Sequence, residues 1–174
     1  LTPAHIERYE KLFDQAEQLV ADSTQLLERV RIARLPLEFA IMEQAKKNFY
    51  GDRGVFEKVE GRWQVKPAIR AMIDPFTDLC IREGVSQVKE WSTTPDEYRA
   101  SMYRMFSQGM NEHLAFGKKV TFISPESAKL KIGGDKMLTD GIRGSHDFDY
   151  SWLGFSGENL EVVIDLEEVK KVKL

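Results

Sequence analysis

The sequence contains a single cysteine, Cys80, which excludes a disulfide within the chain and a zinc site built from several cysteines. It also lacks a long apolar run, because no run approaches the roughly 18–20 residues that a membrane-spanning helix needs. No segment at its start has the pattern of a signal peptide. We therefore expect no membrane span and no disulfide scaffold.

A basic excess is missing as well. Lysine and arginine number 25 against 28 aspartates and glutamates, which gives a net charge of −3. Residues 1–113 and 114–174 are each slightly acidic, whereas proteins that bind nucleic acid normally carry a basic surface. We therefore expect no nucleic-acid partner. A hydrophobic fraction of 42% with 30% charged residues is typical of a globular protein.

Helical periodicity dominates residues 1–113. Apolar residues recur at steps of three or four, which predicts four helices in this part. These helices are expected to start at Thr2-Pro3, to cover about Thr24–Asn48, to span about 67–84, and to start at Thr94-Pro95. The last start is the clearest, because Thr94 and Glu97 have the spacing of a capping box.

Pro36 and Pro75 lie inside two of the predicted helices. We expect each to kink or break its helix, because proline removes a backbone hydrogen bond and clashes with the preceding turn. Cys80 falls on an apolar face, so we interpret it as a buried apolar group and not as a reactive thiol.

The β-like segments are shorter. Residues 54–66 alternate around Glu60-Gly61, which predicts a small hairpin. After residue 114 the strongest strand candidates are 119–123 and 160–166, separated by a segment rich in glycine, aspartate and serine. The sequence therefore predicts an α+β fold. A helical accessory domain over 1–113 forms an irregular four-helix bundle with a hairpin insertion, and a β domain occupies 114–174.

No catalytic set emerges from the residues. The three histidines are far apart in sequence, and no zinc-protease, serine-hydrolase or phosphate-binding motif occurs. We therefore assign no catalytic residue to this segment. An enzyme with a site hidden in the helical part is an alternative against which this absence weighs.

An acidic cluster suggests a metal site. Asp140, Asp147 and Asp149 lie in a glycine-containing loop, and calcium accepts carboxylate and backbone oxygens flexibly. The alternative, which the spacing favours, is that Asp140 forms a turn with its own backbone and the other two are solvated. Calcium at Asp140 is the one cofactor considered.

Aromatic residues gather in the same part of the chain. Sugars stack on exposed rings, so Tyr150 and Trp152, beside aspartate and arginine, are candidates for carbohydrate binding. The two residues share one parity and would lie on one face of a strand, which is also how a hydrophobic core is built. The core interpretation is favoured.

Several sequence motifs between residues 111 and 166 resemble those of a discoidin-like domain, also called the factor V/VIII C-type domain. These are 111–121 (NEHLAFGKKVT), 138–145 (LTDGIRGS), 152–155 (WLGF) and 163–166 (VIDL). Such domains are appended to bacterial glycoside hydrolases, including β-hexosaminidases. The resemblance implies a jelly-roll β-sandwich, with a structural calcium near the Asp140-Gly141 motif.

The helical part is similar to the C-terminal helical region of a family of large, mostly Bacteroidetes proteins related to α-glucuronidases. The similar features are the pattern from Tyr9 to Phe39, then Trp63, Pro67, and Thr94-Pro95 with Glu97-Tyr98. In that family an (α/β)₈ catalytic barrel precedes the helices and a discoidin-like domain follows them.

Together the resemblances imply a non-catalytic segment of a bacterial glycoside hydrolase. It would brace the barrel, begin a carbohydrate-binding module for a polysaccharide or other glycan, and be periplasmic, secreted or at the cell surface. A structural or protein-interaction module without sugar affinity is the alternative. A discoidin-like jelly roll is longer than 114–174, so we expect a fragment in which the sandwich is truncated and the strand partners of 160–166 are missing.

Overall fold

The computed structural model describes residues 2–89, 92–110, 112–123, 135–142, 153 and 159–172. The chain divides into two compact units, Leu1–Ser107 and Gln108–Leu174. Within the described ranges there are four α-helices and two antiparallel two-stranded sheets, so the α+β class is confirmed at that level. In the same ranges, no helix combines the length and apolar character that crossing a membrane requires.

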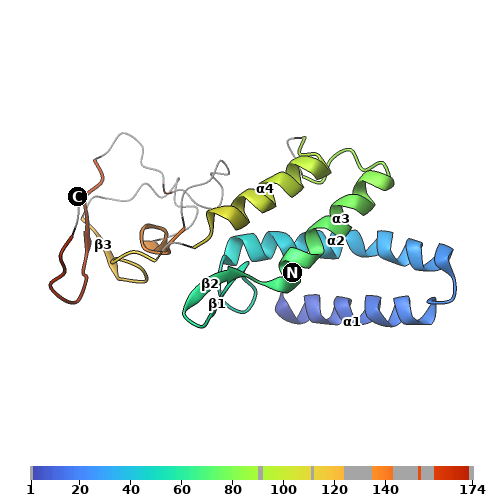
Figure 1. The fold of residues 1–174 in the computed structure, drawn as a ribbon, viewed down its shortest axis with the longest axis horizontal. Coiled ribbons are helices and arrows are strands. Elements are labelled where there is room, and N and C mark those ends of the chain that lie inside the picture. The colour runs from blue at the N-terminus through green and yellow to red at the C-terminus, as the bar shows by residue number, and fades with distance from the viewer. Residues whose placement is uncertain are drawn as a thin grey trace. The chain divides into compact units, whose positions relative to one another are not determined.

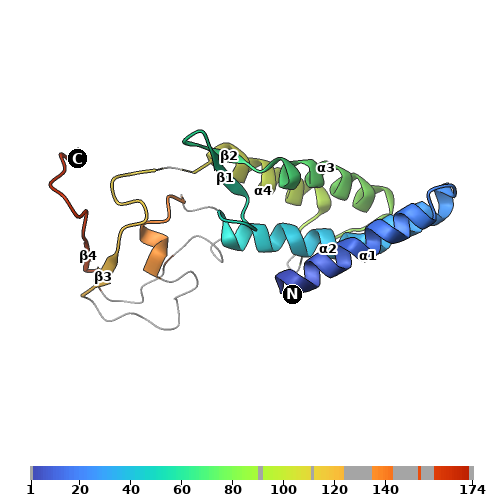
Figure 2. The same ribbon diagram turned by 90° about the horizontal axis from the view of Figure 1, so that it is seen from below.

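Two long helices form one side of the first unit. Helix α1 (Pro3–Leu19) and helix α2 (Thr24–Asn48) lie side by side and antiparallel (Figures 1 and 2). The hydroxyl of Thr2 caps α1 by accepting the His5 N–H, and the hydroxyl of Ser23 caps α2 by accepting the Leu26 N–H. The predicted bounds of α2 are confirmed.

The apolar face predicted for α1 consists of Ile6, Tyr9, Phe13, Ala16 and Val20, and it is only partly covered. Ile6 is buried and Phe13, Ala16 and Val20 are half-buried, whereas Tyr9 is 47% exposed. Leu19, which is not part of this face, is 86% exposed. Helix α1 therefore buries only a narrow stripe, against α2.

The hairpin predicted over 54–66 is confirmed. Strand β1 (Phe56–Val59) pairs antiparallel with β2 (Arg62–Val65), with Val59 opposite Arg62. The two turn residues, Glu60 and Gly61, both have positive φ, as a tight hairpin with the right twist requires.

Helices α3 (Pro67–Arg82) and α4 (Pro95–Gln108) complete the unit. The capping box of α4 is confirmed: the Thr94 N–H donates to the Glu97 carboxylate at 2.8 Å, and the Glu97 N–H donates to the Thr94 hydroxyl at 3.3 Å. Helices α2 and α3 run without interruption through Pro36 and Pro75, so a break at either proline is excluded. Both prolines are exposed, and solvent can replace the one backbone donor that each removes.

The core of the unit lies among α2, α3 and α4. Met42, Ile73 and Met102 are completely buried, and the Tyr98 ring packs 5.6 Å from Phe39 and 6.0 Å from Phe76 between centroids. Cys80 is also buried, at 2% exposure, and burial together with the nearby Glu38 carboxylate raises its pKa. Its interpretation as a core residue is confirmed.

The second unit contains β3 (Val120–Phe122), the short helix η2 (Asp135–Leu138) and β4 (Val162–Ile164). Strands β3 and β4 pair antiparallel, with Val120 opposite Ile164. The expectation that the partners of 160–166 are missing is therefore wrong for β4, which pairs with the other predicted strand of the tail. This pairing joins distant segments, and strand propensity alone does not reveal it.

Candidate functional site

Asp140 lies at the end of η2, where the metal site was predicted. One oxygen of its carboxylate accepts the Ile142 N–H at 2.9 Å, which closes the turn that was the alternative to calcium binding. Burial raises the pKa of Asp140, and the backbone hydrogen bonds and the nearby His113 partly offset that rise. The carboxylate therefore already has a structural role.

The other members of the predicted sites lie outside the described residues. These are Asp147 and Asp149 of the acidic cluster, and Tyr150 and Trp152 of the aromatic cluster. Among the residues that the structure does describe, no group of three or more histidine, cysteine, aspartate or glutamate side chains is placed to hold a metal ion.

Three of the motifs that resemble a discoidin-like domain, 111–121, 138–145 and 163–166, lie in contact around β3. The Gly117 N–H donates to the Thr139 carbonyl at 2.7 Å, and the Thr139 hydroxyl donates to the Lys118 carbonyl at 3.0 Å. Lys118 also forms an ion pair with Glu167, which directly follows the 163–166 motif. Thr139 is only 3% exposed, so its two hydrogen bonds are largely shielded from water, whereas the Glu167 side chain is 68% exposed.

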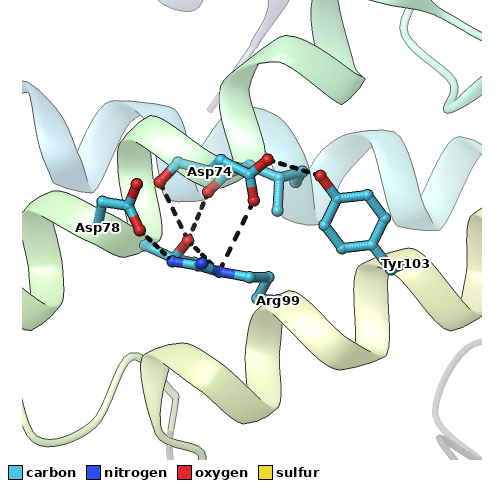
Figure 3. Close-up of polar contacts among 6 residues, drawn as sticks. Asp74, Asp78, Arg99 and Tyr103 are labelled. Carbon is cyan, nitrogen blue, oxygen red and sulfur yellow. Dashed lines mark hydrogen bonds and ion pairs between the residues drawn. The ribbon is translucent and has the colours of Figure 1, made fainter.

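A polar network links α3 to α4 in the first unit (Figure 3). The Arg99 guanidinium donates to Thr77 Oγ1 at 2.8 Å and to Asp78 Oδ1 at 2.5 Å. Tyr103, one turn along α4, donates its hydroxyl to Asp74 Oδ2 at 2.7 Å, and this bond raises the Tyr103 pKa. Sequence analysis missed the network, although the i, i+4 spacing of its members on both helices was a signal that could have found it.

A second charged group joins α1 to α2. The Arg34 guanidinium bonds Asp14 and Glu17 of α1, each at 2.9 Å, and it lies 3.9 Å from Glu38 on its own helix. Burial raises the pKa of Glu38, while Arg34 lowers it in part. The Arg34 group and the Arg99 network each pair opposite charges between two helices. Such pairs are suited to fixing the positions of the helices.

The third charged group is more deeply buried. Glu43 on α2 accepts the Tyr98 hydroxyl at 3.0 Å and lies 3.3 Å from the Lys46 ammonium and 3.1 Å from that of Lys89. Lys46 is 7% exposed and also lies over the Tyr98 ring. Buried charges persist only when they are paired in this way, so we assign this group a structural role.

Comparison of the chain with protein-family models, curated proteins and solved structures finds no match.

Proposed function

We propose that this chain is a non-catalytic C-terminal segment of a bacterial glycoside hydrolase. Its helical unit braces a preceding (α/β)₈ catalytic barrel, and its second unit begins a carbohydrate-binding module of the discoidin-like jelly-roll type. In this proposal the protein acts in the periplasm or outside the cell.

The contact between the motifs 111–121, 138–145 and 163–166 around β3 is the observation that carries the proposal. The resemblance rests on short motifs that are far apart in sequence. Residues of those motifs lie within hydrogen-bond distance of one another at Gly117, Lys118 and Thr139, and the strand pair joins Val120 to Ile164. Motifs of one domain family are expected to belong to a single packed unit, so their contact supports the proposal.

The proposed bracing role draws support from the charged links between helices. Arg34 of α2 forms ion pairs with carboxylates of α1, and Arg99 of α4 forms an ion pair with a carboxylate of α3. Each uses an arginine that bonds more than one partner, and such geometry orients helices more strictly than a single ion pair. A unit held in this way is suited to supporting a neighbouring domain.

Three exposed apolar residues of α1 favour a second candidate function, that of a protein-interaction module without sugar affinity. Tyr9, Leu12 and Leu19 of this helix are each at least 47% exposed. Apolar surface of this kind is frequently covered by a partner.

Affinity electrophoresis of the chain in gels that contain xylan, β-glucan or chitosan tests the first proposal against the second. We expect one polysaccharide to retard the chain relative to albumin, and the Tyr150→Ala and Trp152→Ala variants to migrate faster. Migration equal to that of albumin in every gel would favour the interaction module. Hydrolysis of aryl glycosides by the chain alone would contradict the assignment of catalysis to another domain.

A further inference from the structure

The helical unit contains an open pocket that neither predicted site uses. Its volume is about 760 Å³, within the range of roughly 300–1,000 Å³ that is usual for small-molecule sites. It lies where the first turns of α1, the last turns of α2, the loop before β1 and the start of α3 come together.

The pocket is lined by both apolar and polar residues. The apolar ones include Ile6 of α1 and Ile69 of α3, which are almost completely buried, and Ile41 of α2. Among the polar ones are Glu10 on α1 and Gln44 and Asn48 on α2. Helical spacing explains this lining, because residues three, four and seven apart share one face of a helix.

The loop on one side of the pocket is strained. Phe49 has φ 55° and ψ −51°, and the Tyr50 N–H donates to the Asn48 carbonyl at 2.6 Å, which is the geometry of a rare γ-turn. Gly54 crosses Tyr50 so closely that an added Cβ would lie 2.4 Å from the Tyr50 backbone. Backbone strain of this kind is concentrated at ligand sites, which makes the pocket a candidate.

The two cations of the pocket hold this loop in place. Arg53 donates to the Glu7 carboxylate and to the Pro3 carbonyl, both at 3.1 Å. The Lys66 ammonium donates to the carbonyls of Gly51 and Asp52, at 2.5 and 2.7 Å. Because both cations are engaged by the protein, an anionic ligand would find little positive charge to bind.

The remaining groups fit a ligand with both hydroxyls and an apolar face. Side-chain amides donate and accept hydrogen bonds, carboxylates accept them, and a hydroxyl can do both. The half-buried Ile41 and Tyr50, whose ring packs against Trp63, offer apolar surface to the C–H face of a sugar ring. An entirely apolar ligand would take the exposed Asn48 amide and Asp52 carboxylate out of water without replacing their hydrogen bonds to it.

We propose that this pocket binds a neutral pyranose unit of a glycan, with Asn48 and Asp52 bonding its hydroxyls. The choice of a glycan rests on the proposed function, whereas the position of the site rests on the pocket itself. Its residues differ from Tyr150 and Trp152, the sugar-binding candidates named from the sequence.

Titration of the ¹⁵N-labelled full chain by NMR tests the proposal, with xylobiose, cellobiose and N,N′-diacetylchitobiose as probes. We expect at least one sugar to shift the amides of residues 48–54. Asn48→Ala and Asp52→Ala should each weaken that binding about tenfold, since each removes a hydrogen bond to the ligand. The matched controls Gln25→Ala and Asp22→Ala, exposed positions outside the pocket, should bind as the unaltered chain does.

Other outcomes separate the pocket from the proposed function. Shifts confined to residues 108–174, with retardation in polysaccharide gels unchanged by Asn48→Ala, would overturn the pocket site and leave the proposed function standing. Shifts of 48–54 by 1,5-diaminopentane and by none of the sugars would overturn the assigned ligand class. Absence of shifts at 48–54 with every sugar, in a chain whose spectrum is that of a folded protein, would also overturn the site.

Discussion

At the scale of single residues, Gly54 has no room for a side chain. The Tyr50 backbone occupies the space where a Cβ would stand, whereas Gly51, in the same loop, has nothing within 4 Å of that position. The two glycines therefore separate two physical effects. Gly51 requires only a positive φ, and Gly54 requires the absence of a side chain.

Gly54→Ala should lower the free energy of unfolding by about 3 kcal/mol, because a clash with backbone cannot be relieved by rotating a side chain. Gly51→Ala should cost about 1–2 kcal/mol, the penalty of a left-handed conformation alone. Urea unfolding followed by circular dichroism measures both changes. Equal losses in the two variants would contradict the importance of the close crossing.

Glu97 gives a pH-dependent effect at the same scale. The backbone N–H and hydroxyl of Thr94 bond its carboxylate and lower its pKa, so the folded state holds the ionised form more strongly than the unfolded chain does. The stabilisation is therefore present above the unfolded pKa of about 4.3 and is lost as the pH falls through the lower folded value.

Glu97→Gln should be less stable than the unaltered chain near neutral pH, and the difference should shrink in acid. Urea unfolding at about pH 7 and about pH 3 measures it. Thr94→Ala, which removes the hydroxyl but keeps the backbone N–H that bonds Glu97, should cost about 1 kcal/mol near neutral pH and should weaken this acid dependence without abolishing it. A Glu97→Gln effect of the same size at both pH values would argue against the charged cap.

At the scale of helices, the contacts between elements depend strongly on arginine. Arg34 is one-fifth exposed and reaches two carboxylates of α1, whereas the neighbouring Arg31 is 57% exposed and lies 4.0 Å from Glu17. Arg34 and Arg31 lie three residues apart on α2, and both pair with carboxylates of α1. They can therefore be compared as a half-buried and an exposed ion pair.

Arg34→Lys should destabilise the chain by about 1 kcal/mol, because an ammonium cannot bond two carboxylates with the fork geometry of a guanidinium. Arg31→Lys should change stability by less than about 0.5 kcal/mol, as is usual for exposed pairs. Thermal unfolding at low and high salt measures the difference, which should be smaller at high salt. Equal effects of the two substitutions would contradict a special role for Arg34.

At the scale of the whole molecule, the chain forms two compact units. The first has a core of large apolar side chains, including Met42 and Ile73. In the second, the described residues include a short strand pair and the buried Thr139, whose hydroxyl bonds the Lys118 carbonyl. Damage to the second unit should therefore leave the first intact.

Thr139→Val should destabilise the second unit by about 1–3 kcal/mol, since the Lys118 carbonyl loses a buried donor. Native-state hydrogen exchange should report faster exchange in β3 and unchanged exchange at Met42 and Ile73. Thr121→Val, at an exposed position of β3, should change neither. Faster exchange throughout the helical unit of Thr139→Val would contradict the independence of the two units.

The sequence by itself determined the ends of several helices and the position of the hairpin. Caps such as Thr94 with Glu97, and the Glu60-Gly61 turn, act over a few residues, and the same residues that carry the signal make the bonds. The turn at Asp140 was also foreseeable, because its carboxylate bonds a backbone N–H two residues away. Local chemistry of this kind is complete within a short stretch of sequence.

Only the tertiary structure decided which distant segments meet. Examples are the pairing of β3 with β4, the link from Arg99 to Asp78, and the pocket beside Gly54. It also decided that α2 continues through Pro36, since a helix supported by packing tolerates the loss of one backbone bond. The physical reason is that these contacts exist only after the chain has folded, when the burial of side chains offsets the entropy of bringing distant segments together.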